Sequence, residues 1–163
     1  METLATIFLY LHIGGAIVAF GPTIALPFIA AKAANEPMHG NFALRVSDVI
    51  VTRVVEPGAG FVFLMGIGLI WTRNWNPFTT LWLLLAIILF LITLGFSLFV
   101  QAPVLKRMIA LTSGPPPAPA EGQAPAGPPA EFVALSKRAA LGGQFMLLML
   151  FSILFLMVFK PFS

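Results

Sequence analysis

Cysteine is absent from this chain of 163 residues, and charged residues make up only 9% of it. Without cysteine, the chain cannot form disulfides, thiolate zinc sites or cysteine-ligated iron–sulfur clusters. A soluble domain carries about 25% charged residues, so this chain has too few to cover a water-facing surface. Hydrophobic residues make up 59% of the sequence, and its mean hydropathy is +0.97. Together these values predict an integral membrane protein.

Several kinds of functional motif are also missing. Two histidines, His12 and His39, cannot by themselves build a multi-ligand metal site. The sequence has no glycine-rich phosphate loop and no nucleophile motif, which argues against a hydrolase or a nucleotide-driven pump. Its nine lysines and arginines are too few and too scattered for a nucleic-acid-binding patch. These absences favour a non-catalytic role over an enzymatic one.

Four stretches are apolar enough to cross the ~30 Å hydrocarbon core of a bilayer, which requires roughly 20 residues of helix. We predict a single all-α membrane domain over residues 1–163, an antiparallel up-down bundle of four transmembrane helices. A proline-rich segment at 114–130 is expected to be a flexible linker, because it has little apolar surface to bury. The four predicted spans are residues 4–31, 49–71, 81–100 and 139–159.

The basic residues are distributed unevenly between the connections. Only Arg73 and Lys160 lie at the outer ends of the predicted spans. Basic residues are enriched on the cytoplasmic side of membrane proteins, so we expect both chain termini outside the cytoplasm. The other seven basic residues lie in or beside the two longer connections: Lys32, Arg45, Arg53, Lys106, Arg107, Lys137 and Arg138.

His12 lies within the first predicted span, where an ionisable side chain is costly and indicates a functional site. Its neighbours along one helix face, Gly15, Ala16, Ala19 and Thr23, are all small. Such a face permits the close approach of another helix. It would also make room for a flat cofactor such as haem b, with the imidazole as axial ligand. Packing is the favoured interpretation. A second axial ligand would have to be a methionine, or the iron would be five-coordinate.

Arg53 and Glu56 form a second polar group, near the start of the second span. Their spacing of three residues places them on one helix face, where pairing would offset the cost of burial. Pro57 follows directly and predicts a kink in the helix. The favoured interpretation is a neutralised pair that positions the helix at the membrane interface. The alternatives are a proton or ion relay, a site for an anionic headgroup or a propionate, or the polar gate of a small transporter.

The fourth span contains two polar residues, Gln144 and Ser152, on the face that also carries Lys137 and Leu148. Polar side chains in transmembrane helices commonly hydrogen-bond between helices. We therefore expect this face to point into the bundle and to contribute to helix packing.

Three short segments carry a family resemblance: LYLHIGGAIVAFGPTIALPFIAAKA in the first span, MGIGLIW at 65–71 and QAPVLKRM at 101–108. They resemble a bacterial family of predicted integral membrane proteins, the domain of unknown function numbered twenty-two sixty-nine. The resemblance covers nearly the whole chain except the proline-rich linker. It implies the bacterial inner membrane, but no activity is established for that family.

That family is in turn similar to copper-resistance membrane domains and to the haem-binding protoporphyrinogen oxidase of many bacteria. A first-helix histidine is implicated in haem binding in the oxidase group, and His12 matches that position. The oxidase group also relies on a basic residue within a later span, which the third and fourth spans here lack. The resemblance therefore extends to haem binding but not to the oxidase activity.

The favoured function is a structural or accessory subunit that contacts lipid and packs against other membrane subunits or further copies of itself. The first alternative is a redox or porphyrin-handling protein that binds haem b through His12. A weaker alternative is a small transporter that uses Arg53 and Glu56.

Overall fold

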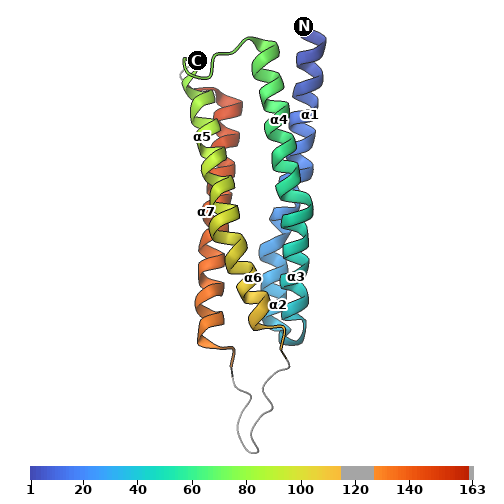
Figure 1. The fold of residues 1–163 in the computed structure, drawn as a ribbon, viewed down its shortest axis with the longest axis vertical. Helices are drawn as coiled ribbons and strands as arrows, with labels where there is room; N and C mark the ends of the chain where they lie inside the picture. The colour runs from blue at the N-terminus through green and yellow to red at the C-terminus, as the bar shows by residue number, and fades with distance from the viewer. Residues whose placement is uncertain (115–126, 162–163) are drawn as a thin grey trace, which may run out of the picture.

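The computed structural model describes residues 1–114 and 127–161, so most of the predicted linker, residues 115–126, lies outside the described residues. The described chain is an all-α bundle of four long helices running antiparallel, with both ends of the chain at the same end of the bundle (Figure 1). Each helix is long and apolar enough to cross a membrane. The four-span, up-down prediction is therefore confirmed.

The first long helix is interrupted by a tighter turn. It consists of α1 (Glu2–Phe20), the 3-10 segment η1 (Gly21–Ala25) and α2 (Leu26–Asn35). Pro22 has no N–H to continue the α-helical hydrogen bonding, so the chain changes its winding there. The Thr23 hydroxyl donates to the last carbonyl of α1 at 2.6 Å and so satisfies one of the acceptors freed by the interruption.

The second and third long helices share one feature, a π-helical segment that ends two residues before a proline. In the second, η3 (Val51–Val55) precedes α4, whose second residue is Pro57. In the third, η4 (Ser97–Gln101) precedes α6, whose second residue is Pro103. A π turn shifts the backbone hydrogen bonds by one residue and thereby accommodates the proline within a continuous helix. The other short segment is η2 (Pro37–His39). The α-helical segments after α2 are α3 (Gly40–Ile50), α4 (Glu56–Arg73), α5 (Leu81–Phe96), α6 (Ala102–Leu111) and α7 (Ala130–Phe159).

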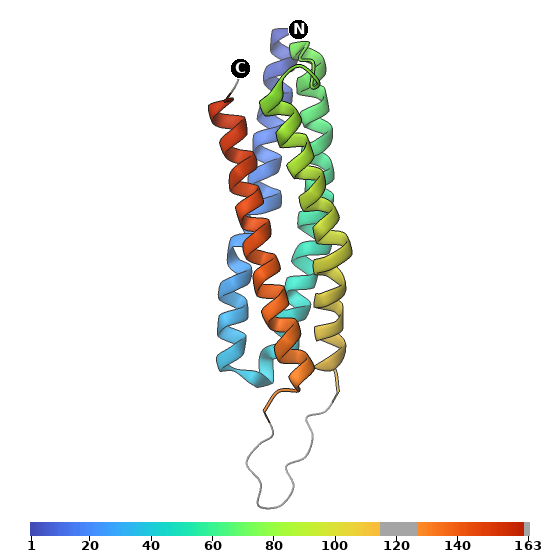
Figure 2. The same cartoon turned by 90° about the vertical axis from the view of Figure 1, so that its left-hand side faces the viewer.

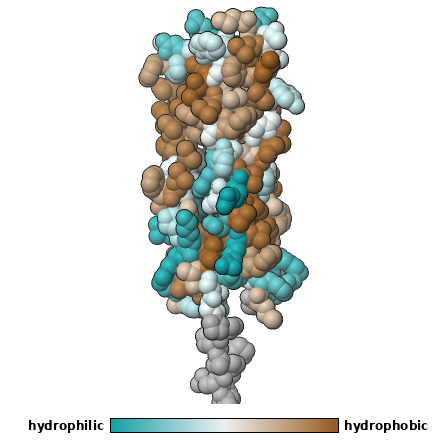
Figure 3. Space-filling model, turned by 45° about the vertical axis from the view of Figure 1, so that its right-hand side comes forward, coloured by the Kyte–Doolittle hydropathy of each residue, from teal (hydrophilic) through white to brown (hydrophobic). Residues whose placement is uncertain are grey.

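The helices extend beyond the predicted spans. The third long helix, Leu81–Leu111, has 31 residues and is about 46 Å long at 1.5 Å per residue, against ~30 Å of hydrocarbon. Its last turns carry charged residues that the hydrocarbon excludes, so they project past it. Figure 3 shows hydrophilic side chains gathered over the lower half of one face, the half that holds α2, α3 and α6.

The four helices pack as two close pairs. α1 lies along α4, and α5 lies along α7 (Figures 1 and 2). The pairs are joined where α3 meets α6, at the end of the bundle that carries the α6–α7 connection. At the opposite end, a buried hydrophobic cluster centres on Trp82, Leu83, Ala86 and Leu156.

Candidate functional site

Glycines allow α1 and α4 to approach each other closely. A Cβ on Gly58 would lie 2.5 Å from the Cβ of Ala19, and a Cβ on Gly15 would lie 2.8 Å from the ring of Phe61. Both distances are too short for real atoms, so a side chain at Gly58 would push the two helices apart, whereas one at Gly15 would have to displace the Phe61 ring. Ala19 is only 1% exposed. The small residues on this face of α1 are therefore covered by α4.

A hydrogen bond from the His12 side chain joins α1 to α4. Its Nδ1 lies 2.9 Å from the carbonyl oxygen of Val62 on α4, and its ring is half-buried against Gly66. A carbonyl only accepts hydrogen bonds, so Nδ1 donates and carries the proton. In the neutral ring, Nε2 then holds the free lone pair. This is the arrangement seen in most metal-ligating histidines, whose other nitrogen donates to a carbonyl or carboxylate.

The surroundings of His12 fit a haem only in part. Nε2 is a suitable axial ligand, but Gly15 and Ala19, the residues expected to make room for a flat group, are packed against α4. Ala16 is half-buried on the same helix. Within the part of the chain that the structure describes, no group of three or more histidines and carboxylates could hold a metal ion. Of the two interpretations of the small-residue face, the geometry shows close helix packing.

Arg53 and Glu56 do not form the ion pair that their spacing suggested. Arg53 is exposed and Glu56 is half-buried, and the ion pairs among the described residues involve other side chains. The physical reason is the π segment η3, which contains Arg53 and ends just before Glu56. A π turn holds more residues than an α turn, so side chains three apart no longer share a face.

The polar residues of α7 also differ from expectation. Ser152 donates to the Leu148 carbonyl of its own helix at 2.9 Å, and Gln144 is exposed rather than directed into the bundle. The interhelical hydrogen bond instead comes from Gln101 of η4, whose side-chain nitrogen donates to the Ala139 carbonyl on α7 at 2.9 Å. Sequence reasoning overlooked Gln101, although a polar residue two positions before a proline was a usable signal.

Two further polar contacts hold the lower half of the bundle together. The side-chain amide of Asn41 on α3 donates to Thr112 Oγ1 just after α6, at 2.9 Å. Arg107 on α6 donates from Nε to Glu131 on α7 at 2.8 Å. Both charged residues lie beyond the apolar stretches 81–100 and 139–159, and the hydrogen bond from Arg107 lowers the pKa of the Glu131 carboxyl.

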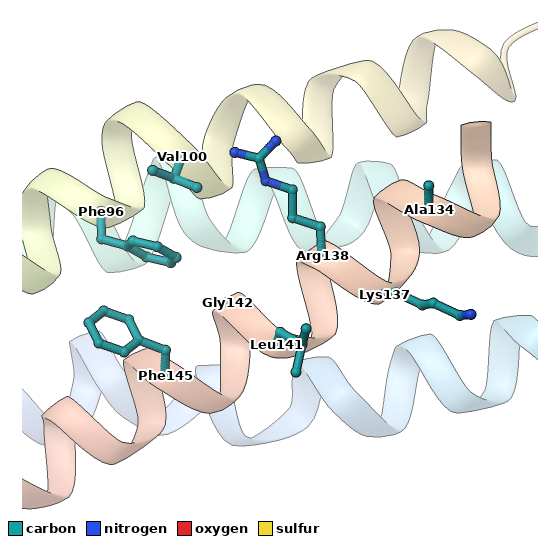
Figure 4. Close-up of a pocket in the computed structure, with 8 residues that line it drawn as sticks. All are labelled: Phe96, Val100, Ala134, Lys137, Arg138, Leu141, Gly142 and Phe145. Carbon is teal, nitrogen blue, oxygen red and sulfur yellow. The ribbon is translucent and has the colours of Figure 1, made fainter. Parts of the chain in front are cut away.

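A groove of about 670 Å³ opens between the third long helix and α7 (Figure 4). Phe96 and Phe145 lie against each other in it, with ring centroids 4.8 Å apart. Arg138 extends toward the helix that carries Val100, whereas Lys137 points in a different direction (Figure 4). We call this the α5–α7 groove, and its lining residues are Phe96, Val100, Ala134, Lys137, Arg138, Leu141, Gly142 and Phe145.

A family model described as "Predicted integral membrane protein (DUF2269)" matches residues 6–161. The chain belongs to the DUF2269 family. No curated protein and no solved structure matches it. The DUF2269 match confirms the resemblance inferred from the sequence, and it spans all four long helices, His12 and the α5–α7 groove. It assigns this DUF2269 protein to the membrane without giving it an activity.

Proposed function

We propose that this protein is a non-catalytic accessory subunit of a membrane complex and that α7 contributes a contact surface for another transmembrane helix. The observation that carries this proposal is the exposure of Gln144. Gln144 lies five residues inside the apolar stretch 139–159, which is about 8 Å along the helix axis. An amide facing hydrocarbon without a partner is unfavourable, so a neighbouring protein surface is the better environment.

The residues around Gln144 suit a helix–helix contact. Ala140 and Gly143 lie beside it on α7, and both are exposed. Small residues let two helix backbones come close, and a polar side chain then hydrogen-bonds across the contact. The same combination packs α1 against α4 inside this chain. On α7 these residues are available to a second protein or to another copy.

Site-specific crosslinking tests the proposed contact. Because the native sequence has no cysteine, an introduced cysteine is the only thiol of the chain that can react. Gln144→Cys, expressed in its native membrane, should form a crosslinked species of higher mass with a cysteine-reactive crosslinker. Leu154→Cys is the matched control, because Leu154 is also on α7 and is 53% exposed. If the two variants crosslink equally, or if Gln144→Cys stays monomeric, the accessory-subunit proposal is wrong.

A second candidate function, haem b binding for redox or porphyrin chemistry, is favoured by the hydrogen bond from His12 Nδ1 to Val62. That bond fixes the ring and leaves Nε2 as the coordinating atom, and a bound haem would supply one-electron chemistry. The test is an absorption spectrum of the purified protein before and after dithionite. A Soret band that is lost in His12→Ala and kept in His39→Ala supports this function. A featureless visible spectrum from folded protein excludes it.

A further inference from the structure

The cationic end of the α5–α7 groove carries charge that no described carboxylate neutralises. Lys137 and Arg138 are both exposed, and neither pairs with a carboxylate among the described residues. The neighbouring basic residue Arg107, by contrast, is paired with Glu131, which lies one heptad before Arg138 on α7. The groove is therefore apolar along its length and positively charged at one end.

That end lies where lipid headgroups are expected. Lys137 and Arg138 immediately precede the uncharged stretch 139–159. Basic side chains at the ends of transmembrane helices extend to the headgroup region, where they attract anionic lipids. The apolar part of the groove, with Leu141 and Phe145, begins within the next turn of the helix.

A second hollow follows the first along the same two helices. It has a volume of about 530 Å³ and is lined by Leu85, Leu89, Phe151, Ser152, Phe155 and Leu156. The two hollows lie on one face of α7, because their lining residues follow helical spacing. These are Arg138 and Phe145 in the first hollow and Ser152 and Leu156 in the second. From Arg138 to Leu156 the helix rises about 27 Å, which exceeds the ~15 Å thickness of one leaflet.

We propose that the α5–α7 groove binds an anionic phospholipid, with its phosphate at the Arg138 guanidinium and one acyl chain along the apolar seam, while Lys137 adds positive charge to the same end. Gly142 sets the depth of the groove, because it is buried against Gln101 and adds no side chain of its own. Gln144 lies one heptad after Lys137, at the edge of the groove, and is not one of the residues that line it. This inference does not depend on the proposed accessory role.

Native mass spectrometry of the full chain in a non-ionic detergent tests the assignment. Dioleoylphosphatidylglycerol should bind roughly tenfold more tightly than dioleoylphosphatidylcholine, since each basic residue near a headgroup contributes electrostatic attraction. The double substitution Lys137→Gln/Arg138→Gln should abolish that preference. Lys32→Gln/Arg45→Gln is the control, because it makes the same charge change on α2 and α3, which lie at the same end of the bundle.

Three outcomes would overturn the proposal: equal binding of both lipids to the native chain, equal losses in the two double variants, or displacement of the lipid by excess inorganic phosphate. The last would identify a site for a soluble anion instead. Ala134→Trp fills the groove from an exposed lining position and should weaken binding of both lipids. If it fails to fold, the charge variants still decide the question, because their substituted side chains are exposed.

Discussion

The imidazole of His12 donates from Nδ1 to the carbonyl oxygen of Val62 across 2.9 Å and so joins α1 to α4. Interhelical hydrogen bonds in membranes contribute about 0.6 kcal/mol on average and at most ~1.7 kcal/mol. Replacement by alanine also removes the ring that packs against Gly66. We expect His12→Ala to destabilise the protein by about 1–2 kcal/mol in detergent unfolding experiments. His39→Ala, at an exposed position, should leave the unfolding midpoint unchanged.

Two nearby glycines of α4 should respond oppositely to alanine. A Cβ at Gly58 would lie 2.5 Å from the Ala19 Cβ and 3.2 Å from its Cα, and the backbone atom cannot move aside without separating the helices. We expect Gly58→Ala to cost about 1–3 kcal/mol of stability. Gly60→Ala meets nothing within 4 Å and should be neutral or stabilising, by up to ~1 kcal/mol, through its helix propensity. Equal unfolding midpoints for the two variants would contradict the described α1–α4 packing.

Acid should weaken the link between α6 and α7. Arg107 lowers the pKa of the Glu131 carboxyl in the folded protein. The stability contributed by this pair is therefore fully present above the unfolded pKa of Glu, about 4.3, and is lost as the pH falls through the lower folded value. Between about pH 5 and pH 3, the thermal midpoint of the native chain should fall further than that of Arg107→Gln. Parallel midpoint curves would show that the pair contributes nothing, as many exposed ion pairs do.

The orientation of the bundle is open to direct measurement. The excess of basic residues in the longer connections predicts that these connections are cytoplasmic. Met38→Cys and Phe78→Cys place single thiols at opposite ends of the bundle, at positions that are 94% and 85% exposed. A membrane-impermeant maleimide applied to spheroplasts should label the thiol at position 78 and leave the one at position 38 unlabelled until lysis. The reverse pattern would invert the predicted topology.

The sequence shows the small-residue face around His12 but not what covers that face. The face formed by His12, Gly15 and Ala19 was visible in the sequence, because helical spacing fixes which residues share a side. Whether that face meets a helix or a flat cofactor depends on which segment approaches it. The facing residues, Gly58, Val62 and Gly66, lie about 40 to 55 positions later in the chain.

The sequence by itself determined the four membrane-spanning helices, their antiparallel order and the prolines that disturb their winding, because hydrophobic length and missing N–H groups are local properties. Only the tertiary structure decided that Arg53 and Glu56 are unpaired and that Gln101, rather than Gln144, links α7 to its neighbour. The π segments η3 and η4, which contain Arg53 and Gln101, rotate side chains by a fraction of a turn relative to uniform α-helical winding. Helical periodicity read from the sequence assumes uniform winding, so it could not anticipate those rotations.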